Sequence, residues 1–156
     1  MMDKVSIYVN TTAKSPAPQK AAGYFIIEHL KDGIPITKEG RLYRDRITGT
    51  DLTLQLLCNA VYLVSKSNVE YETLVIATKD PLVDSAFNQK WIDTWKENEW
   101  KNKKGEEVSN SEDWQQLCSL LDGLSHRYLF SNKNTSYFNI MEMWSESYLR
   151  LKTLGA

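Results

Sequence analysis

The first part of the chain has the hydrophobic pattern of β-strands. Apolar and β-branched residues recur over 4–10, 22–30 and 36–43, and Asp32-Gly33 between the last two segments is typical of a hairpin turn. Pro35, just before the third segment, suits the start of a strand, where no ladder donor is needed. Three consecutive strands of this kind predict an antiparallel meander.

The rest of the chain alternates helical spacing with short buried strands. Asp80 followed by Pro81 predicts a helix start, and Ser109 three residues before Glu112 has the spacing of a capping box. Further helical spacing covers 51–66, 87–100, a segment ending near Gly123, and 136–154; the two further strands cover 71–77 and 126–130. One side of the last helix is expected to carry Phe138, Met141, Trp144, Tyr148 and Leu151.

This order, βββαβαααβα, predicts one α/β domain over residues 1–156. We expect a five-stranded mixed sheet, with three antiparallel strands followed by parallel ones, and helices on both faces.

Composition narrows the class of protein. The 156 residues carry 19 basic and 20 acidic side chains, a net charge of -1, which excludes a uniformly basic nucleic-acid binder but not a local basic patch. Two cysteines, Cys58 and Cys118, are too few for a disulfide scaffold and are interpreted as small core residues. No apolar run is long enough to span a bilayer. We therefore expect a cytoplasmic protein without membrane association.

A cluster of tryptophans and lysines carries a resemblance to a known family. Trp91-Ile-Asp-Thr-Trp95 and Trp100 precede a basic loop over 101–104, and Trp114-Gln-Gln-Leu follows. This stretch resembles the basic protrusion, or handle, of the type 1 ribonuclease H family. Ser6-Ile7-Tyr8-Val9-Asn10 is similar to the family's first strand, and Asp80 precedes Trp91 at the spacing of a catalytic aspartate. The resemblance implies a ribonuclease H-like fold.

The resemblance also implies a nucleic-acid interface. Ser15 matches an asparagine that contacts nucleic acid in the family, and the handle residues that would bind RNA–DNA hybrid or another duplex are Trp91, Trp95, Lys96, Trp100, Lys101, Lys103 and Lys104. A second interpretation remains open for each of them: tryptophans four residues apart commonly pack between helices, and loop lysines are commonly solvated.

The family's chemistry requires carboxylates that this sequence does not have. Two-metal hydrolysis uses four clustered carboxylates to hold two Mg²⁺ ions. The first position is Asn10, and the second is Thr53 or Gln55, depending on the alignment. The third, Asp80, is retained, although helix capping alone would account for it. Near the fourth position, Glu142 is the closest carboxylate, and the family's histidine-bearing loop has no histidine over 131–136.

Three functions follow from these observations. The leading one is a domain that has lost hydrolytic activity and binds RNA–DNA hybrid or another nucleic-acid duplex. No cofactor is expected for it, and a weak Mg²⁺ or Mn²⁺ site at Asp80 is expected only if activity remains. The alternatives are a protein-interaction scaffold with the same fold, which a protein partner would reveal, and a metal-dependent hybrid endonuclease with an atypical site on Asp80 and Glu142, assisted by Asn10 and Asp51.

Overall fold

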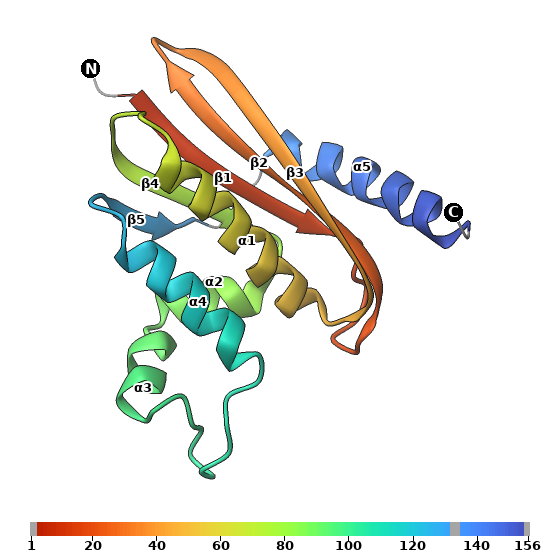
Figure 1. Cartoon of the computed structure of the whole chain (residues 1–156), viewed down its shortest axis with the longest axis vertical. Helices are drawn as coiled ribbons and strands as arrows, with labels where there is room; N and C mark the ends of the chain where they lie inside the picture. The colour runs from red at the N-terminus through yellow and green to blue at the C-terminus, as the bar shows by residue number, and fades with distance from the viewer. Residues whose placement is uncertain (1–2, 132–134, 155–156) are drawn as a thin grey trace.

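The computed structural model describes residues 3–131 and 135–154, and it contains the expected mixed sheet (Figure 1). The strands are β1 (Asp3–Thr11), β2 (Gln19–Lys31), β3 (Ile34–Ile47), β4 (Tyr71–Thr78) and β5 (Arg127–Phe130). Their spatial order is β3-β2-β1-β4-β5. The first three strands pair antiparallel, whereas β4 pairs parallel with both β1 and β5. The mixed sheet predicted from the sequence, with three antiparallel strands followed by parallel ones, is confirmed.

Helices cover both faces of this sheet (Figure 1). They are α1 (Gly49–Lys66), α2 (Pro81–Asn88), α3 (Trp91–Glu97), α4 (Ser111–Asp122) and α5 (Ser136–Thr153). Val5, Ile7 and Val9 alternate along β1 and are buried in the same core as most of α1, because side chains two apart share one face of a strand. The opposite face packs under α5, where Phe138 and Met141 are buried. No helix within the described ranges is long and apolar enough to cross a membrane.

The segment before α4 differs in detail from the sequence expectation. Helical spacing over 87–100 is interrupted because Lys90 and Trp100 have left-handed backbone angles, with φ of 61° and 62°, which no α-helix accommodates. The capping box on Ser109 was also wrong. Asn110 precedes α4 with a φ of 63° and makes no side-chain cap, while the Ser111 hydroxyl donates a hydrogen bond back to Glu107.

The predicted apolar side of α5 is only partly buried. Phe138 and Met141 are buried, but Trp144 is 39% exposed and Leu151 is 60% exposed. The C-terminal half of the helix still contacts the sheet, since Trp144 packs against Tyr24 of β2 and Tyr148 against Tyr43 of β3, but its other side is open to solvent. The exposed half of α5 is therefore a surface feature rather than core.

The two cysteines are expected to be unreactive in the folded protein. Cys58 and Cys118 are buried, and burial raises the pKa of their thiols to about 12 and about 11, so almost no thiolate exists near neutral pH. A thiol-reactive disulfide reagent at pH 8 should label neither cysteine in the native protein and both in denaturant. Rapid labelling of the native protein would contradict their assignment to the core.

Candidate functional site

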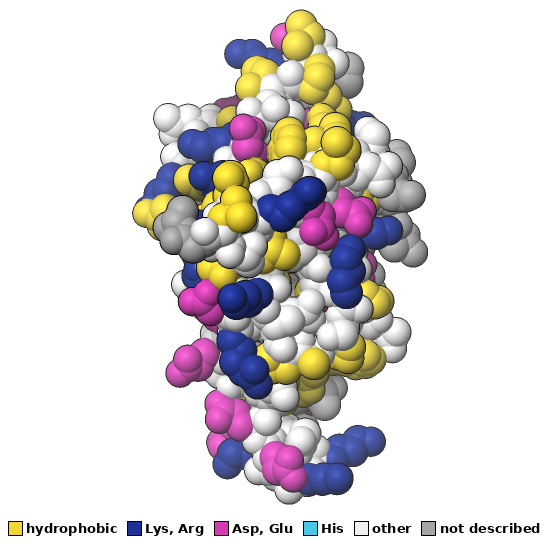
Figure 2. All heavy atoms as spheres, turned by 90° about the vertical axis from the view of Figure 1, so that its right-hand side faces the viewer, with side chains coloured by type: hydrophobic (Ala, Val, Ile, Leu, Met, Phe, Trp, Pro, Cys, Tyr) yellow, Lys and Arg dark blue, Asp and Glu magenta, His cyan; other side chains and the backbone are white. Residues whose placement is uncertain are grey.

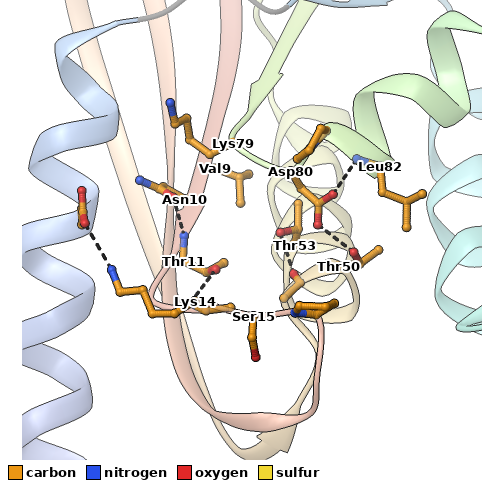
Figure 3. Close-up of a pocket in the computed structure, with 15 residues that line it drawn as sticks. Val9, Asn10, Thr11, Lys14, Ser15, Thr50, Thr53, Lys79, Asp80 and Leu82 are labelled. Carbon is orange, nitrogen blue, oxygen red and sulfur yellow. Dashed lines mark hydrogen bonds and ion pairs between the residues drawn. The ribbon is translucent and has the colours of Figure 1, made fainter.

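The ends of two parallel strands define the candidate site. β1 and β4 are paired as far as Val9 and Thr78, so Asn10 and Asp80 follow at the same edge of the sheet, where α/β folds commonly place their sites. An open cleft of about 630 Å³ lies there (Figure 3). Thr53 of α1 and Glu142 of α5 also line it, so two helices complete a site that two strands begin.

Asp80 is committed to hydrogen bonds within the protein. One carboxylate oxygen accepts from the backbone N–H groups of Leu82 and Val83, at 2.9 and 3.2 Å, and so caps α2. The other oxygen accepts from the hydroxyl of Thr50 at 2.8 Å. Figure 3 shows the carboxylate turned toward these partners. Capping of this kind contributes about 1 kcal/mol, which gives Asp80 a structural role whatever else it does.

Asn10 is likewise held by its neighbours. Its Nδ2 donates to the carbonyl of Phe138 at 3.0 Å, and its Oδ1 accepts from the N–H of Thr11 at 2.9 Å. The amide therefore joins the end of β1 to the start of α5. It is neutral, so it supplies none of the charge that two adjacent dications need.

The structure separates the two residues that the sequence left open on α1. Thr53 lines the cleft, and its hydroxyl donates to the carbonyl of Gly49 at 2.8 Å. Gln55 lies elsewhere on the helix, where its Nε2 is 3.5 Å from a carboxylate oxygen of Asp113. Two residues along a helix differ by about 200° in direction, which explains why only one of them faces the cleft.

Two lysines that the sequence pattern did not single out line the cleft. Lys14 Nζ lies 3.4 Å from Glu142 and 3.6 Å from Glu146, so it joins the β1–β2 loop to α5 (Figure 3). Lys79 precedes Asp80 and lines the same cleft, with Nζ 5.5 Å from the centre of the Phe138 ring. For Lys79 the sequence offered one signal, which is its position next to Asp80 at the end of a strand. For Lys14 it offered none.

These residues do not fit a pair of divalent metals. Among the described residues, no group of three or more His, Cys, Asp and Glu side chains is arranged to hold a metal ion. Asp80 already accepts three hydrogen bonds, and Glu142 is paired with Lys14. Lys14 and Lys79 also line the cleft that contains the carboxylates of Asp80 and Glu142. Their positive charges oppose the binding of a further cation.

The segment that resembles the family's handle, residues 91–114, is built around its tryptophans, and we keep the name handle for it. Trp114 is 1% exposed, and its ring centre lies 5.3 Å from that of Trp95. Trp95 also contacts Trp91 at 6.4 Å and Trp100 at 6.2 Å, so the four rings pack together between α3 and α4. This packing supports the interpretation of the tryptophans as core. Trp100 directly precedes the lysines of the loop after α3, so its packing against Trp95 also positions those lysines.

The basic side chains of the handle are at its surface. Lys101, Lys103 and Lys104 are exposed on the loop that projects away from the sheet in Figure 1. Lys96 is paired with Asp122 at 3.4 Å. Ser15 is far from these residues in the fold: it lines the cleft, where its hydroxyl and carbonyl both accept hydrogen bonds from Gln19. The residues predicted to bind nucleic acid therefore lie in two separate regions, with Ser15 in the cleft and the others in the handle.

The chain has a ribonuclease H-like fold, and it is similar in sequence to known ribonucleases H. No family model matches the chain. It is 29% identical over 133 residues to the ribonuclease H of Clostridium botulinum strain Hall, with 82% of each chain covered. It is 26% identical over 121 residues to the ribonuclease H of Caldicellulosiruptor saccharolyticus, with 77% of each covered.

Solved structures give the same result for the fold. LC9-RNase H1, a type 1 enzyme with the type 2 active-site motif, superposes with a TM-score of 0.75 at 12% identity, covering 96% of this chain and 73% of that one. LC11-RNase H1, solved in complex with RNA/DNA hybrid, gives 0.72 at 14% identity, covering 97% of this chain and 100% of that one. The resemblance to the type 1 ribonuclease H family predicted from the sequence is confirmed.

Proposed function

We propose that this ribonuclease H-like domain binds duplex nucleic acid, with RNA–DNA hybrid as its principal ligand, and does not hydrolyse it. The observation that carries the proposal is the cleft. Asn10 and Thr53 are neutral, Asp80 caps a helix, and Glu142 pairs with Lys14. Hydrolysis through two metals needs a concentration of negative charge that these four side chains do not supply.

Binding is supported by what the fold retains. The structural relative LC11-RNase H1 has been solved with a bound RNA/DNA hybrid, and its fold covers 97% of this chain. The exposed lysines Lys101, Lys103 and Lys104 lie on one projecting loop, where they could contact consecutive phosphates of a duplex. Glu106 and Glu107 on the same loop reduce its net charge, so we expect modest, salt-sensitive affinity with little sequence preference.

The cleft would contribute to binding through cations of the protein. Lys79 lines the cleft and forms no ion pair with a carboxylate of the described residues, whereas Lys14 is shared with Glu142 and Glu146, and a protonated amine interacts with a phosphate without any metal. The protein should therefore not need divalent ions, and it should bind hybrid in a chelator at least as tightly as in Mg²⁺, which competes with lysines for phosphates. In an enzyme of this fold that held its metals between substrate and carboxylates, a chelator would instead weaken the complex.

The test combines binding with cleavage on one substrate. We expect a fluorescently labelled RNA–DNA hybrid to bind in EDTA with a Kd no higher than in Mg²⁺ or Mn²⁺, and to remain intact on a denaturing gel after prolonged incubation with either ion. Cleavage that disappears in Asp80→Ala would overturn the proposal in favour of an atypical nuclease. Absence of binding to any duplex at low salt would overturn it in favour of a protein-interaction scaffold.

The contribution of the handle is tested by removing two charges. Lys103→Gln/Lys104→Gln should weaken hybrid binding, and the slope of log K against log salt should become shallower by about 0.9 for each phosphate that the variant no longer neutralises. The matched control is Lys31→Gln/Lys38→Gln, which removes the same charge from the β2–β3 hairpin at the opposite end of the molecule. Equal weakening in both variants would show that only net charge matters and that the handle has no special part.

A further inference from the structure

An aromatic and basic cluster lies outside both the cleft and the handle. It is formed where the exposed half of α5 meets β2 and β3, and we call it the aromatic–cation surface; its members are Tyr24, Arg41, Tyr43, Trp144, Tyr148 and Lys152. The Tyr24 ring lies 5.4 Å from Trp144 and 6.4 Å from Tyr148, and Tyr43 lies 6.4 Å from Tyr148. Four rings from three elements are thus contiguous.

Two cations are interleaved with these rings. The guanidinium carbon of Arg41 is 4.0 Å from the centre of the Tyr148 ring, and Lys152 Nζ is 5.7 Å from the same ring and 6.0 Å from that of Tyr43. Within the parts of the chain that the structure describes, neither cation forms an ion pair with a carboxylate. Their charges therefore remain available to an anionic ligand.

The cluster is accessible to a ligand. Arg41 and Lys152 are exposed, and Trp144 is 39% exposed although it is one of the largest apolar side chains. Figure 2 views this side of the molecule and shows hydrophobic and basic side chains next to one another. The hydroxyl of Tyr43 donates a hydrogen bond to the carboxylate of Asp45 at 2.7 Å. This hydrogen bond raises the pKa of the Tyr43 phenol. The ring remains neutral at physiological pH.

We propose that the aromatic–cation surface binds single-stranded nucleic acid. Unpaired bases stack on exposed aromatic side chains and on guanidinium planes, while neighbouring cations contact the phosphates. A duplex has its base faces already stacked, so it uses only the cations of such a surface. The combination of rings with unpaired cations favours a single strand over an apolar protein segment, which would leave the two charges without a partner.

This surface is independent of the proposed duplex site. It lies on β2, β3 and the C-terminal half of α5, whereas the handle lies on α3, α4 and the loop between them (Figure 1). The two sites can therefore be tested in one pair of variants. Lys103→Gln/Lys104→Gln should weaken binding of the duplex more than binding of the single strand, and Arg41→Gln/Lys152→Gln should weaken binding of the single strand more than binding of the duplex.

The experiment measures binding of a labelled 12-nucleotide oligo(dT) by fluorescence anisotropy. We expect Arg41→Gln/Lys152→Gln to raise its Kd at least fivefold and to reduce the salt slope by about 1.4, since each single-strand phosphate contact contributes about 0.7. The control Lys31→Gln/Lys38→Gln should leave the Kd within twofold. The strand should also quench tryptophan fluorescence in the unmodified protein, and less so in Trp144→Phe, which keeps an aromatic ring at this position.

Three results would overturn the inference. The first is no binding of oligo(dT) by the unmodified protein at low salt. The second is an unchanged Kd in Arg41→Gln/Lys152→Gln, which would place the strand elsewhere. The third is quenching of Trp144 by a proline-rich peptide in the absence of any effect of oligo(dT), which would make this a peptide-docking surface. None of these results bears on duplex binding, whose failure would appear separately in the hybrid titration.

Discussion

Replacing Asn10 by Asp together with Thr53 by Glu is expected to create a divalent-cation site in the cleft. Both positions line the cleft with Asp80, so the change would add two carboxylates to the one that Asp80 supplies. Hard oxygen ligands of this kind bind Mg²⁺ and Mn²⁺. Isothermal titration should detect one bound Mn²⁺, and saturation at about 100 times Kd should stabilise the variant by about 2.7 kcal/mol.

The control for this experiment is Asn10→Asp/Thr53→Gln, which matches the shape of the first variant without the second new charge. It should bind Mn²⁺ at least tenfold more weakly. Equal affinity in the two variants would contradict the assignment of Thr53 as the cleft-facing residue of α1. Cleavage of RNA–DNA hybrid by the Asp/Glu variant alone would further show that the missing carboxylates, rather than the absence of a histidine over 131–136, are what the natural chain needs for hydrolysis.

Truncating Trp114 is expected to produce the largest loss of stability of any single substitution in the handle. Its side chain is 1% exposed and contacts Trp95 and Phe87, with ring centres 5.3 and 6.1 Å away. Burial of so large an apolar group makes Trp114→Ala cost about 3–5 kcal/mol, because the cavity removes both the transfer free energy and the packing interactions. The midpoint of urea denaturation measures this directly.

Trp144→Ala is the matched control, because it makes the same chemical change at a site that is 39% exposed. It should cost clearly less free energy of unfolding than Trp114→Ala. A similar cost at the two sites would mean that the four-tryptophan cluster is not the core of the handle. Trp114→Ala should also weaken hybrid binding without changing a lysine, since Trp100 and Val108, at the two ends of the loop that carries Lys103 and Lys104, pack against the same core as Trp114.

Much of the candidate site was predictable because it depends on local rules. Asp80 followed by Pro81 identified a helix start, and the capping hydrogen bonds of Asp80 confirm that prediction. Asn10 was predictable as the last residue of an apolar strand, which places it at a sheet edge. The cluster of tryptophans was visible as a pattern, but the sequence did not distinguish packing from ligand contact, since both use the same residues.

Other features depended on contacts between distant segments. The choice between Thr53 and Gln55 needed the rotation of α1 about its axis, which is set by packing against the sheet and α4. The pairing of Lys14 with Glu142 joins residues 128 positions apart, and spacing along the chain does not reveal such a contact. The left-handed residue Lys90 was missed for a similar reason, because the surrounding segment holds it in a conformation that lysine rarely adopts on its own.

The sequence by itself determined the order of helices and strands and the shortage of carboxylates in the cleft, because periodicity and charge are local properties of the residues. Only the tertiary structure decided which side chains share a space. It brought Lys14 and Lys79 to Asn10 and Asp80, and it packed the outer half of α5 against β2 and β3 with one side exposed, so that Trp144 and Arg41 belong to one surface. The physical reason is that side-chain neighbours across a fold are set by packing and helix rotation, which no short stretch of sequence specifies.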